Sequence, residues 1–328
     1  MPLALRPLRY LLVALRTQRR WNQEHLEPVL QPYRKQGEVV DWDKITGYYA
    51  LAVPAVIGEA FALLRSAPLT NQERSAMTYL GALSPVLDDL YDRQHLSTKA
   101  IESLVHHHHV ASANTPAEAL FCELASKALQ QFVPLARAGF DAVKGPLLHA
   151  QAESRKQQLA ETPREALLEI TLNKGGHAFA LYVLPLRTAK DPHTPLAHAL
   201  GAAMQVENDL FDLWKDRQEG VRTACTEATA VHQLRTMYAE ACEQVAGVLA
   251  AHPAGPCQKA AFAYHINLVL ARGLVCLDAL DRWARNHAPF NAYTWPREAL
   301  VVDLDTPLAK WRTLRYASRQ LPVRLSPN

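Results

Sequence analysis

The amino-acid sequence predicts an all-α protein, a single-domain helical barrel or bundle of ten or more helices. Apolar residues recur at helical spacing along most of the chain, and the alternation typical of β-strands is essentially absent. The breaks between helical runs are short, and none resembles an interdomain linker. We therefore expect one domain over residues 1–328, in which residues 1–40 form a basic helical segment.

The predicted helices follow one another along the chain. The first stretch, "MPLALRPLRYLLVALRTQRRW", has a leucine stripe among arginines, which is typical of a first core helix and also fits a helix on a membrane surface. Pro, Thr, Ser or Asp punctuates most of the later runs. These runs cover 42–66, 70–93, 97–108, 116–131, 133–158, 163–186, 194–217, 227–251, 256–286 and 307–320.

Composition narrows the class of protein. The net charge of only +3, with no nucleic-acid-reading motif, argues against a nucleic-acid partner. The five cysteines are odd in number and form no CxxC pair, which indicates reduced thiols and a cytoplasmic protein. We find no signal peptide and expect no segment of membrane-spanning length. A weak contact with a membrane surface and association into a homodimer both remain open.

An acidic cluster lies in "SPVLDDLYDRQHL". Asp88 and Asp92 are one helical turn apart and share a face, with Asp89 beside them, while Leu87 and Leu90 lie opposite. Carboxylates at this spacing destabilise a helix by a few tenths of a kcal/mol. The sequence keeps this unfavourable pair, which indicates that the pair has a use.

A second cluster lies in "AAMQVENDLFDLWKDRQEGVRT". Helical spacing places five polar residues in one stripe opposite an apolar face: Gln205, Asn208, Asp209, Asp212 and Asp216. A face that only meets water is the alternative, but such faces normally mix Lys and Glu at compensating spacings. Partial burial of these carboxylates would require cations.

The ligand types in both clusters favour a hard metal ion. Carboxylate and amide oxygens, without Cys or His, are typical of Mg²⁺, which keeps several waters and is usually shared with a substrate phosphate. We therefore expect a magnesium site and a phosphorylated or diphosphorylated substrate.

At these residues the sequence resembles the class I isoprenoid (terpene) synthase superfamily, an α-helical fold with two facing metal motifs. "DDLYD" matches the DDxxD motif at Asp88, Asp89 and Asp92. "NDLFDLWKD" is similar to the NDxx(S/T)xxxE motif, with Asn208 as expected, Asp212 in place of Ser/Thr and Asp216 in place of Glu. The resemblance implies metal binding by all six residues and a catalytic role for Asp88, Asp92, Asn208, Asp212 and Asp216.

The same stretch resembles a second pattern. Gln205, Asn208, Asp212 and Asp216 match the QxxNxxxDxxxD spacing of squalene and phytoene synthases, which join two prenyl diphosphates. The first motif is also similar to the "DxxxDR" of bacterial large-terpene synthases. Cyclase and two-substrate transferase therefore both remain open.

The resemblance also implies residues that bind diphosphate. Arg164 precedes Asn208 at about the family's spacing for a diphosphate-sensing arginine, and Arg315 with Tyr316 resembles the family's C-terminal Arg-Tyr pair. Lys174, Lys215 and Arg93 are further candidates beside the motifs. Gly175 and Gly176 resemble the family's helix break, although a plain helix stop at this position is equally consistent with the sequence.

The function implied is that of a carbon-oxygen lyase. Three Mg²⁺ ions, or Mn²⁺ in their place, would bind together with the substrate diphosphate and assist ionisation of a prenyl diphosphate. The resulting carbocation would cyclise, lose a proton or capture water. The alternatives are a squalene/phytoene synthase-like prenyltransferase and a non-catalytic isoprenoid-diphosphate binding protein.

Overall fold

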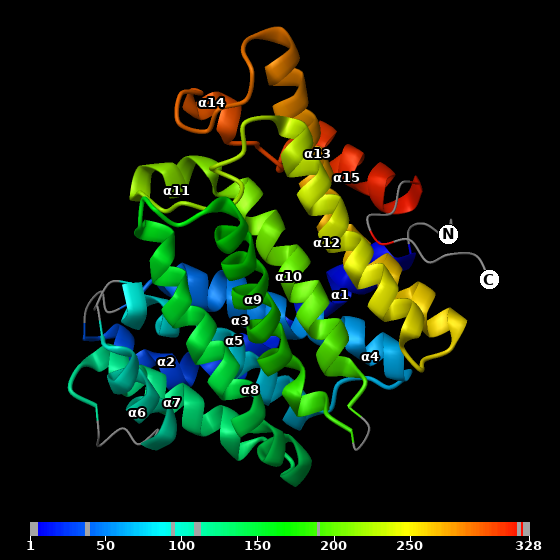
Figure 1. Ribbon diagram of the computed structural model, residues 1–328. Helices are drawn as coiled ribbons and strands as arrows, with labels where there is room; N and C mark the ends of the chain where they lie inside the picture. The colour runs from blue at the N-terminus through cyan, green and yellow to red at the C-terminus, as the bar shows by residue number, and fades with distance from the viewer. Residues whose placement is uncertain are drawn as a thin grey trace. The chain divides into compact units, whose positions relative to one another are not determined.

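A computed structural model describes residues 6–36, 40–92, 96–107, 113–188, 191–319 and 323. These residues form α-helices, short 3-10 and π-helical turns and connecting loops, and no strand occurs among them (Figure 1). More than ten α-helices lie in this part of the chain. The predicted all-α class with ten or more helices is therefore confirmed.

The chain divides into two compact units. Unit 1 comprises Met1–Ala152 and Leu181–His193, and unit 2 comprises Glu153–Ala180 and Thr194–Asn328. The expected single domain over the whole chain stays a prediction.

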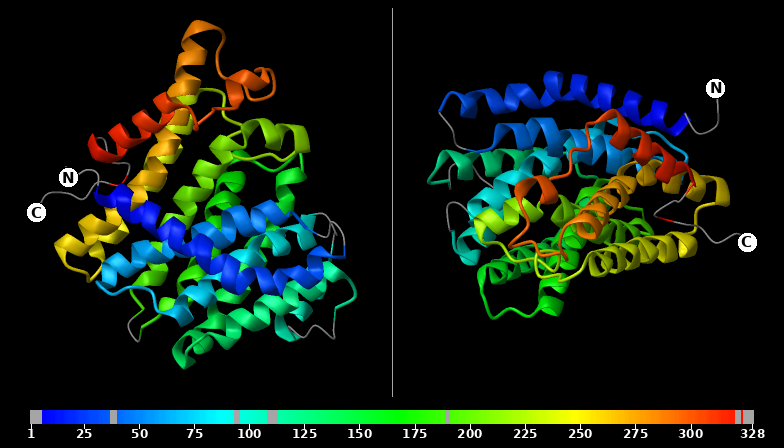
Figure 2. Two further views of the ribbon diagram at one scale, coloured as in Figure 1. Left: turned by 180° about the vertical axis from the view of Figure 1, so that it is seen from behind. Right: turned by 90° about the horizontal axis from the view of Figure 1, so that it is seen from above.

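Unit 1 is built around one long helix, α5, which packs along α7 and against the segment that precedes it. Figure 2 shows α1 lying across that earlier segment, in agreement with its contacts to α3 and η4. The elements of unit 1 are α1 (Arg6–Trp21), η2 (Asn22–Leu26), α2 (Glu27–Arg34), η3 (Lys44–Tyr49), α3 (Ala50–Ala52), η4 (Val53–Gly58), α4 (Glu59–Arg65), α5 (Asn71–Asp92), α6 (Thr98–His107), α7 (Pro116–Gln130), α8 (Pro134–Glu153) and η7 (Leu184–Leu186).

A glycine sets the position of α5 in unit 1. A Cβ atom at Gly81 would lie 2.7 Å from the carbonyl oxygen of Tyr49, closer than real side chains come to a backbone oxygen. Only glycine therefore allows α5 to lie directly against the η3 backbone. This contact fixes the part of α5 that leads to Asp88.

Unit 2 has α13 at its centre, with α12 and α15 packed along it, as Figure 1 shows. The shorter α11 contacts α14. The elements are η6 (Ser154–Gln158), α9 (Arg164–Val183), α10 (His193–Phe211), α11 (Leu213–Glu219), α12 (Val231–Ala251), α13 (Pro256–Asn286), α14 (Arg297–Leu300) and α15 (Pro307–Arg319).

The helix break predicted at Gly175 and Gly176 is wrong. Helix α9 runs without interruption through both residues. A Cβ atom at Gly175 would overlap the carbonyl oxygen of Gly201 on α10, and one at Gly176 would overlap the ring of His198. The glycines therefore serve close packing of α9 on α10, and this packing offsets their low helix propensity.

The helix predicted over 194–217 is instead divided at Asp212. This residue has φ −91° and ψ 6°, so α10 ends at Phe211 and α11 begins at Leu213. Helix α11 ends at Gly220, whose φ of 69° is left-handed and typical of a glycine helix terminus. The bend at Asp212 lies within the second acidic motif.

Two helical segments, Lys44–Arg65 and Pro256–Asn286, reach membrane-spanning length and apolarity, contrary to the expectation from the sequence. About two thirds of each apolar window is buried inside the protein (67% in both). The core helices of globular proteins are also long, apolar and mostly buried, so the length and composition of these two segments are weak evidence for a membrane span.

Candidate functional site

The first acidic motif lies at the end of α5 in unit 1. Asp88 is half-buried and accepts a hydrogen bond from Nε2 of Gln151 on α8. Asp89 is buried, with 7% of its surface exposed. Asp92 is the last residue of α5, and Arg93 lies outside the described residues. Helix α5 thus presents Asp88 toward a neutral amide donor.

A hydroxyl pair lies one turn before Asp88. The hydroxyl oxygens of Ser84 and Tyr182 are 2.6 Å apart. Burial raises the pKa of Tyr182, and the negative charge of Asp88 raises it further. Tyr182 therefore stays protonated and can donate hydrogen bonds near Asp88.

In unit 2, the most enclosed carboxylate of the second motif is Asp209 on α10. It is 4% exposed and accepts hydrogen bonds from Oγ1 of Thr171 at 2.8 Å and from Nε2 of Gln205 at 3.1 Å. Burial raises the pKa of Asp209 to about 6, and the charge of Asp212 adds to this, while the two hydrogen bonds and Lys174 oppose it.

Asp216 is the second buried carboxylate, on α11. Burial raises its pKa to about 8, and the charges of Asp209 and Asp212 contribute further, opposed by Lys215. The Asp216 carboxyl group is therefore mostly protonated at neutral pH, chiefly because burial disfavours its charged form and in smaller part because Asp209 and Asp212 are negatively charged.

Asp212 links this cluster to solvent-exposed groups. Its carboxylate accepts a hydrogen bond from Nδ2 of Asn208 at 3.2 Å and lies 3.5 Å from Nζ of Lys215. Burial lowers the pKa of Lys215, but the charges of Asp212, Glu219 and Asp216 outweigh burial and raise it overall. The structure thus brings Asn208, Asp212 and Lys215 together, as their spacing predicts.

The predicted diphosphate-binding residues fall into two places. Arg164 is half-buried, and its Nε donates a hydrogen bond to the carbonyl of Ala224 at 3.3 Å. The positive charge of Lys174 lowers the pKa of Asp209, opposing the effect of burial. Tyr316 on α15 instead donates to Asp278, and Arg315 lies over the ring of Trp311 at 5.6 Å. The roles of all these residues in diphosphate binding stay predictions.

Of the two residues that enclose Asp209, sequence reasoning selected Gln205, as part of the polar stripe, but not Thr171. Gln205 and Asp209 are four residues apart on one helix face, so their contact could have been found from spacing. Thr171 lies 38 positions earlier on α9 and gives no such signal. In unit 1, the contacts of Gln151 with Asp88 and of Ser84 with Tyr182, which are 63 and 98 positions apart, were missed for the same reason.

The described part of the chain contains no group of three or more His, Cys, Asp or Glu side chains arranged to hold a metal ion. The donors of the second motif are nevertheless all oxygens, which suit a hard divalent ion. A bound cation would also offset the mutual repulsion of Asp209, Asp212 and Asp216.

No protein-family model and no curated protein sequence matches the chain. Its structure is similar to a crystal structure of a dehydrosqualene synthase in complex with ligand, with 18% sequence identity and a TM-score of 0.45, over 89% of this chain and 99% of that chain.

Proposed function

We propose that this protein is a Mg²⁺-dependent terpene synthase that ionises a prenyl diphosphate and releases diphosphate. The observation that carries the proposal is the crowding of Asp209, Asp212 and Asp216, in which burial and like charge raise the pKa of Asp216 to about 8. Carboxylates held in this way gain from a cation, and their spacing resembles a diphosphate-binding motif.

Asn208, Asp212 and Asp216 are the residues of unit 2 that would hold Mg²⁺. Bound Mg²⁺ would supply Lewis-acid polarisation of the leaving diphosphate. The motif of unit 1, with Asp88, Asp89 and Asp92, keeps its predicted metal role as a separate part of the proposal.

Basic residues of unit 2 would bind the diphosphate itself. Lys174 acts electrostatically on Asp209, and Lys215 lies 3.5 Å from Asp212, so both place positive charge beside the carboxylates. Arg164 has its Nε held by the carbonyl of Ala224, which orients the guanidinium. These cations would neutralise charge that develops on the leaving group.

A two-substrate prenyltransferase is the second candidate. The spacing of Gln205, Asn208, Asp212 and Asp216 favours it, because an aspartate stands where terpene cyclases carry Ser or Thr. A non-catalytic isoprenoid-diphosphate binding protein is the third reading and would use the same side chains without turnover.

Diphosphate release tests the proposal. Geranyl, farnesyl, geranylgeranyl and longer prenyl diphosphates would be incubated singly and in pairs, with Mg²⁺, with Mn²⁺ and with chelator, and the organic products identified by mass. We expect metal-dependent release with one-substrate hydrocarbon or alcohol products. Products that contain two substrates would establish the transferase, and binding without release would establish the binding protein.

A further inference from the structure

A second polar site in unit 2 lies between α13 and α15. It is a pocket of about 330 Å³, near the lower end of the range for small-molecule sites. Four arginines, one aspartate and one tyrosine line it: Asp278, Arg282, Arg285, Arg312, Arg315 and Tyr316. Its size suits a compact ligand and its lining suits an anion.

The arginines are arranged as two pairs. Arg282 and Arg285 are three residues apart on α13, and Arg312 and Arg315 are three apart on α15, so each pair shares one face of its helix. Like charges at this spacing destabilise a helix. Packing α15 along α13 then brings the two pairs to one pocket, which adds to the repulsion.

The nearby carboxylates already have other partners. Asp278 accepts from Tyr316 and lies 3.1 Å from Arg235 of α12, and Arg235 also pairs with Asp281. Among the residues that the structure describes, no carboxylate forms an ion pair with any of the four pocket arginines. The pocket therefore carries positive charge that its surroundings do not neutralise.

We propose that this arginine pocket binds a compact phosphate-type polyanion, either free diphosphate or a phosphorylated lipid headgroup. Planar guanidinium groups donate paired hydrogen bonds to phosphate oxygens, and several of them together suit a multiply charged group. The pocket is separate from the acidic face, because α15 lies on α13 while α11 lies apart from both in Figures 1 and 2.

The family resemblance already predicts diphosphate binding by Arg315 and Tyr316 of this pocket, and the structure adds Arg282, Arg285 and Arg312, so the test must separate the pocket from the proposed enzymatic site. The acidic face would need Mg²⁺ to bind diphosphate, whereas the arginine pocket needs no metal. Calorimetry of inorganic diphosphate is therefore carried out in chelator, which removes the metal-dependent contribution of the acidic face, and the comparison of variants below assigns the binding to the pocket.

The test compares two double variants that remove the same charge. Arg285→Gln/Arg312→Gln removes one arginine from each helix of the pocket, and we expect it to weaken diphosphate binding at least about tenfold. The control, Lys99→Gln/Arg297→Gln, changes exposed residues of α6 and α14 outside the pocket and should bind within about twofold of the wild type. Thermal unfolding checks that both variants fold, and Arg282→Gln/Arg315→Gln replaces the first if it does not.

Vesicles separate the two sources of the anion. Cosedimentation with vesicles of phosphatidic acid in phosphatidylcholine, lost in the pocket variant and kept in the control, would establish a lipid headgroup. Diphosphate binding without vesicle binding would establish the free anion. Equal losses in both double variants, or no binding of either probe by the wild type, would overturn the proposal.

Discussion

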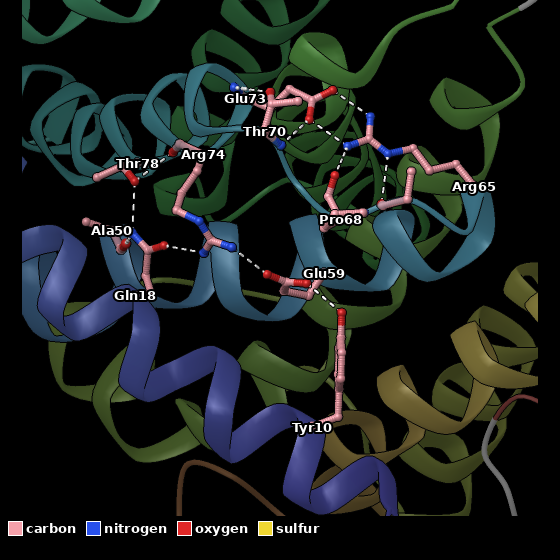
Figure 3. A network of polar contacts seen from close by, with 11 residues as sticks. Tyr10, Gln18, Ala50, Glu59, Arg65, Pro68, Thr70, Glu73, Arg74 and Thr78 are labelled. Atoms are coloured by element: carbon pink, nitrogen blue, oxygen red, sulfur yellow. Dashed lines mark hydrogen bonds and ion pairs between the residues drawn. The ribbon is translucent and has the colours of Figure 1, made fainter.

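Buried charged side chains have different partners in the two units of this protein. In unit 1, Glu59 and Arg74 form an ion pair at 2.6 Å, with side chains only 9% and 10% exposed. Figure 3 shows how this pair is completed: Tyr10 donates to the second oxygen of Glu59 at 2.6 Å, and Arg74 donates to Gln18 at 3.0 Å. Each charged group thus meets an opposite charge and a neutral partner.

In unit 2, Asp209 and Asp216 are equally enclosed, at 4% and 7% exposure. Asp209 accepts only neutral side-chain donors among the contacts described above, and Asp212 raises the pKa of both residues. The comparison separates two uses of buried charge. A matched pair needs no further charge, whereas crowded carboxylates are best explained by a ligand that brings positive charge.

We expect the largest effect on stability from a variant that breaks the ion pair of Glu59 and Arg74. Glu59→Gln leaves the Arg74 guanidinium buried without a countercharge, so we expect it to lower the free energy of unfolding by about 3–5 kcal/mol. Chemical denaturation of the whole chain measures this. Glu27→Gln, which breaks the more exposed pair with Arg34, should cost within about 1 kcal/mol. Equal losses in both variants would contradict the structural role given to Glu59.

The next effect concerns the unmatched cluster. Asp212→Ala removes a proposed metal ligand at the exposed edge of the cluster, and we expect at least about a hundredfold loss of Mg²⁺-dependent diphosphate release with little loss of stability. Asp88→Ala tests the motif of unit 1 in the same assay. Glu240→Ala, an exposed acid on α12, is the control and should keep full turnover. Unchanged turnover in both aspartate variants would remove the metal assignment.

A third variant tests the packing that holds Thr171 beside Asp209. Gly175→Ala places a methyl group against the Gly201 backbone and should destabilise the protein by about 1–3 kcal/mol. Gly247→Ala on α12, where nothing lies within 4 Å, should instead stabilise it by up to about 1 kcal/mol. A stabilising effect of both substitutions, measured by denaturation, would show that α9 and α10 do not pack closely.

The last prediction is a pH dependence of stability. The folded-state pKa of Asp216, about 8, exceeds the value of an unfolded aspartate, near 3.9. The folded protein therefore binds more protons between these values, and its stability should fall as the pH rises from about 4 to about 8, by less than about 1.4 kcal/mol per pH unit from this group.

Thermal unfolding in chelator at pH 5 and pH 8 measures this fall. Asp216→Asn should show a smaller fall than the wild type. Asp209 and Glu207, whose pKa values are raised to about 6 and about 7 mainly by burial, contribute with the same sign in both proteins. The same fall in both proteins would contradict the raised pKa of Asp216.

Helix positions could be predicted well from local signals. The runs predicted at 116–131 and 256–286 correspond to α7 at Pro116–Gln130 and α13 at Pro256–Asn286. Each begins with proline at its first position, and Thr115 caps α7 through its side chain. Such signals act within one helical turn, so they are readable from sequence.

Features that depend on a neighbouring helix could not be predicted in this way. The glycines of α9 predict a helix break because their low helix propensity is a local property. The packing that offsets this low propensity comes from α10, a different helix. The bend at Asp212 likewise lies within a run of continuous helical periodicity. At the two glycines, tertiary packing overrode the local pattern.

The sequence by itself determined that the chain is helical and that Asn208, Asp209, Asp212 and Asp216 follow one another within a few helical turns, because helical periodicity is a property of neighbouring residues. Only the tertiary structure decided which of these carboxylates are buried and what they contact. It enclosed Asp209 with Thr171 of another helix and gathered four arginines from α13 and α15 into one pocket. Burial and partners depend on which helices pack together, and that information is spread over residues far apart in the chain.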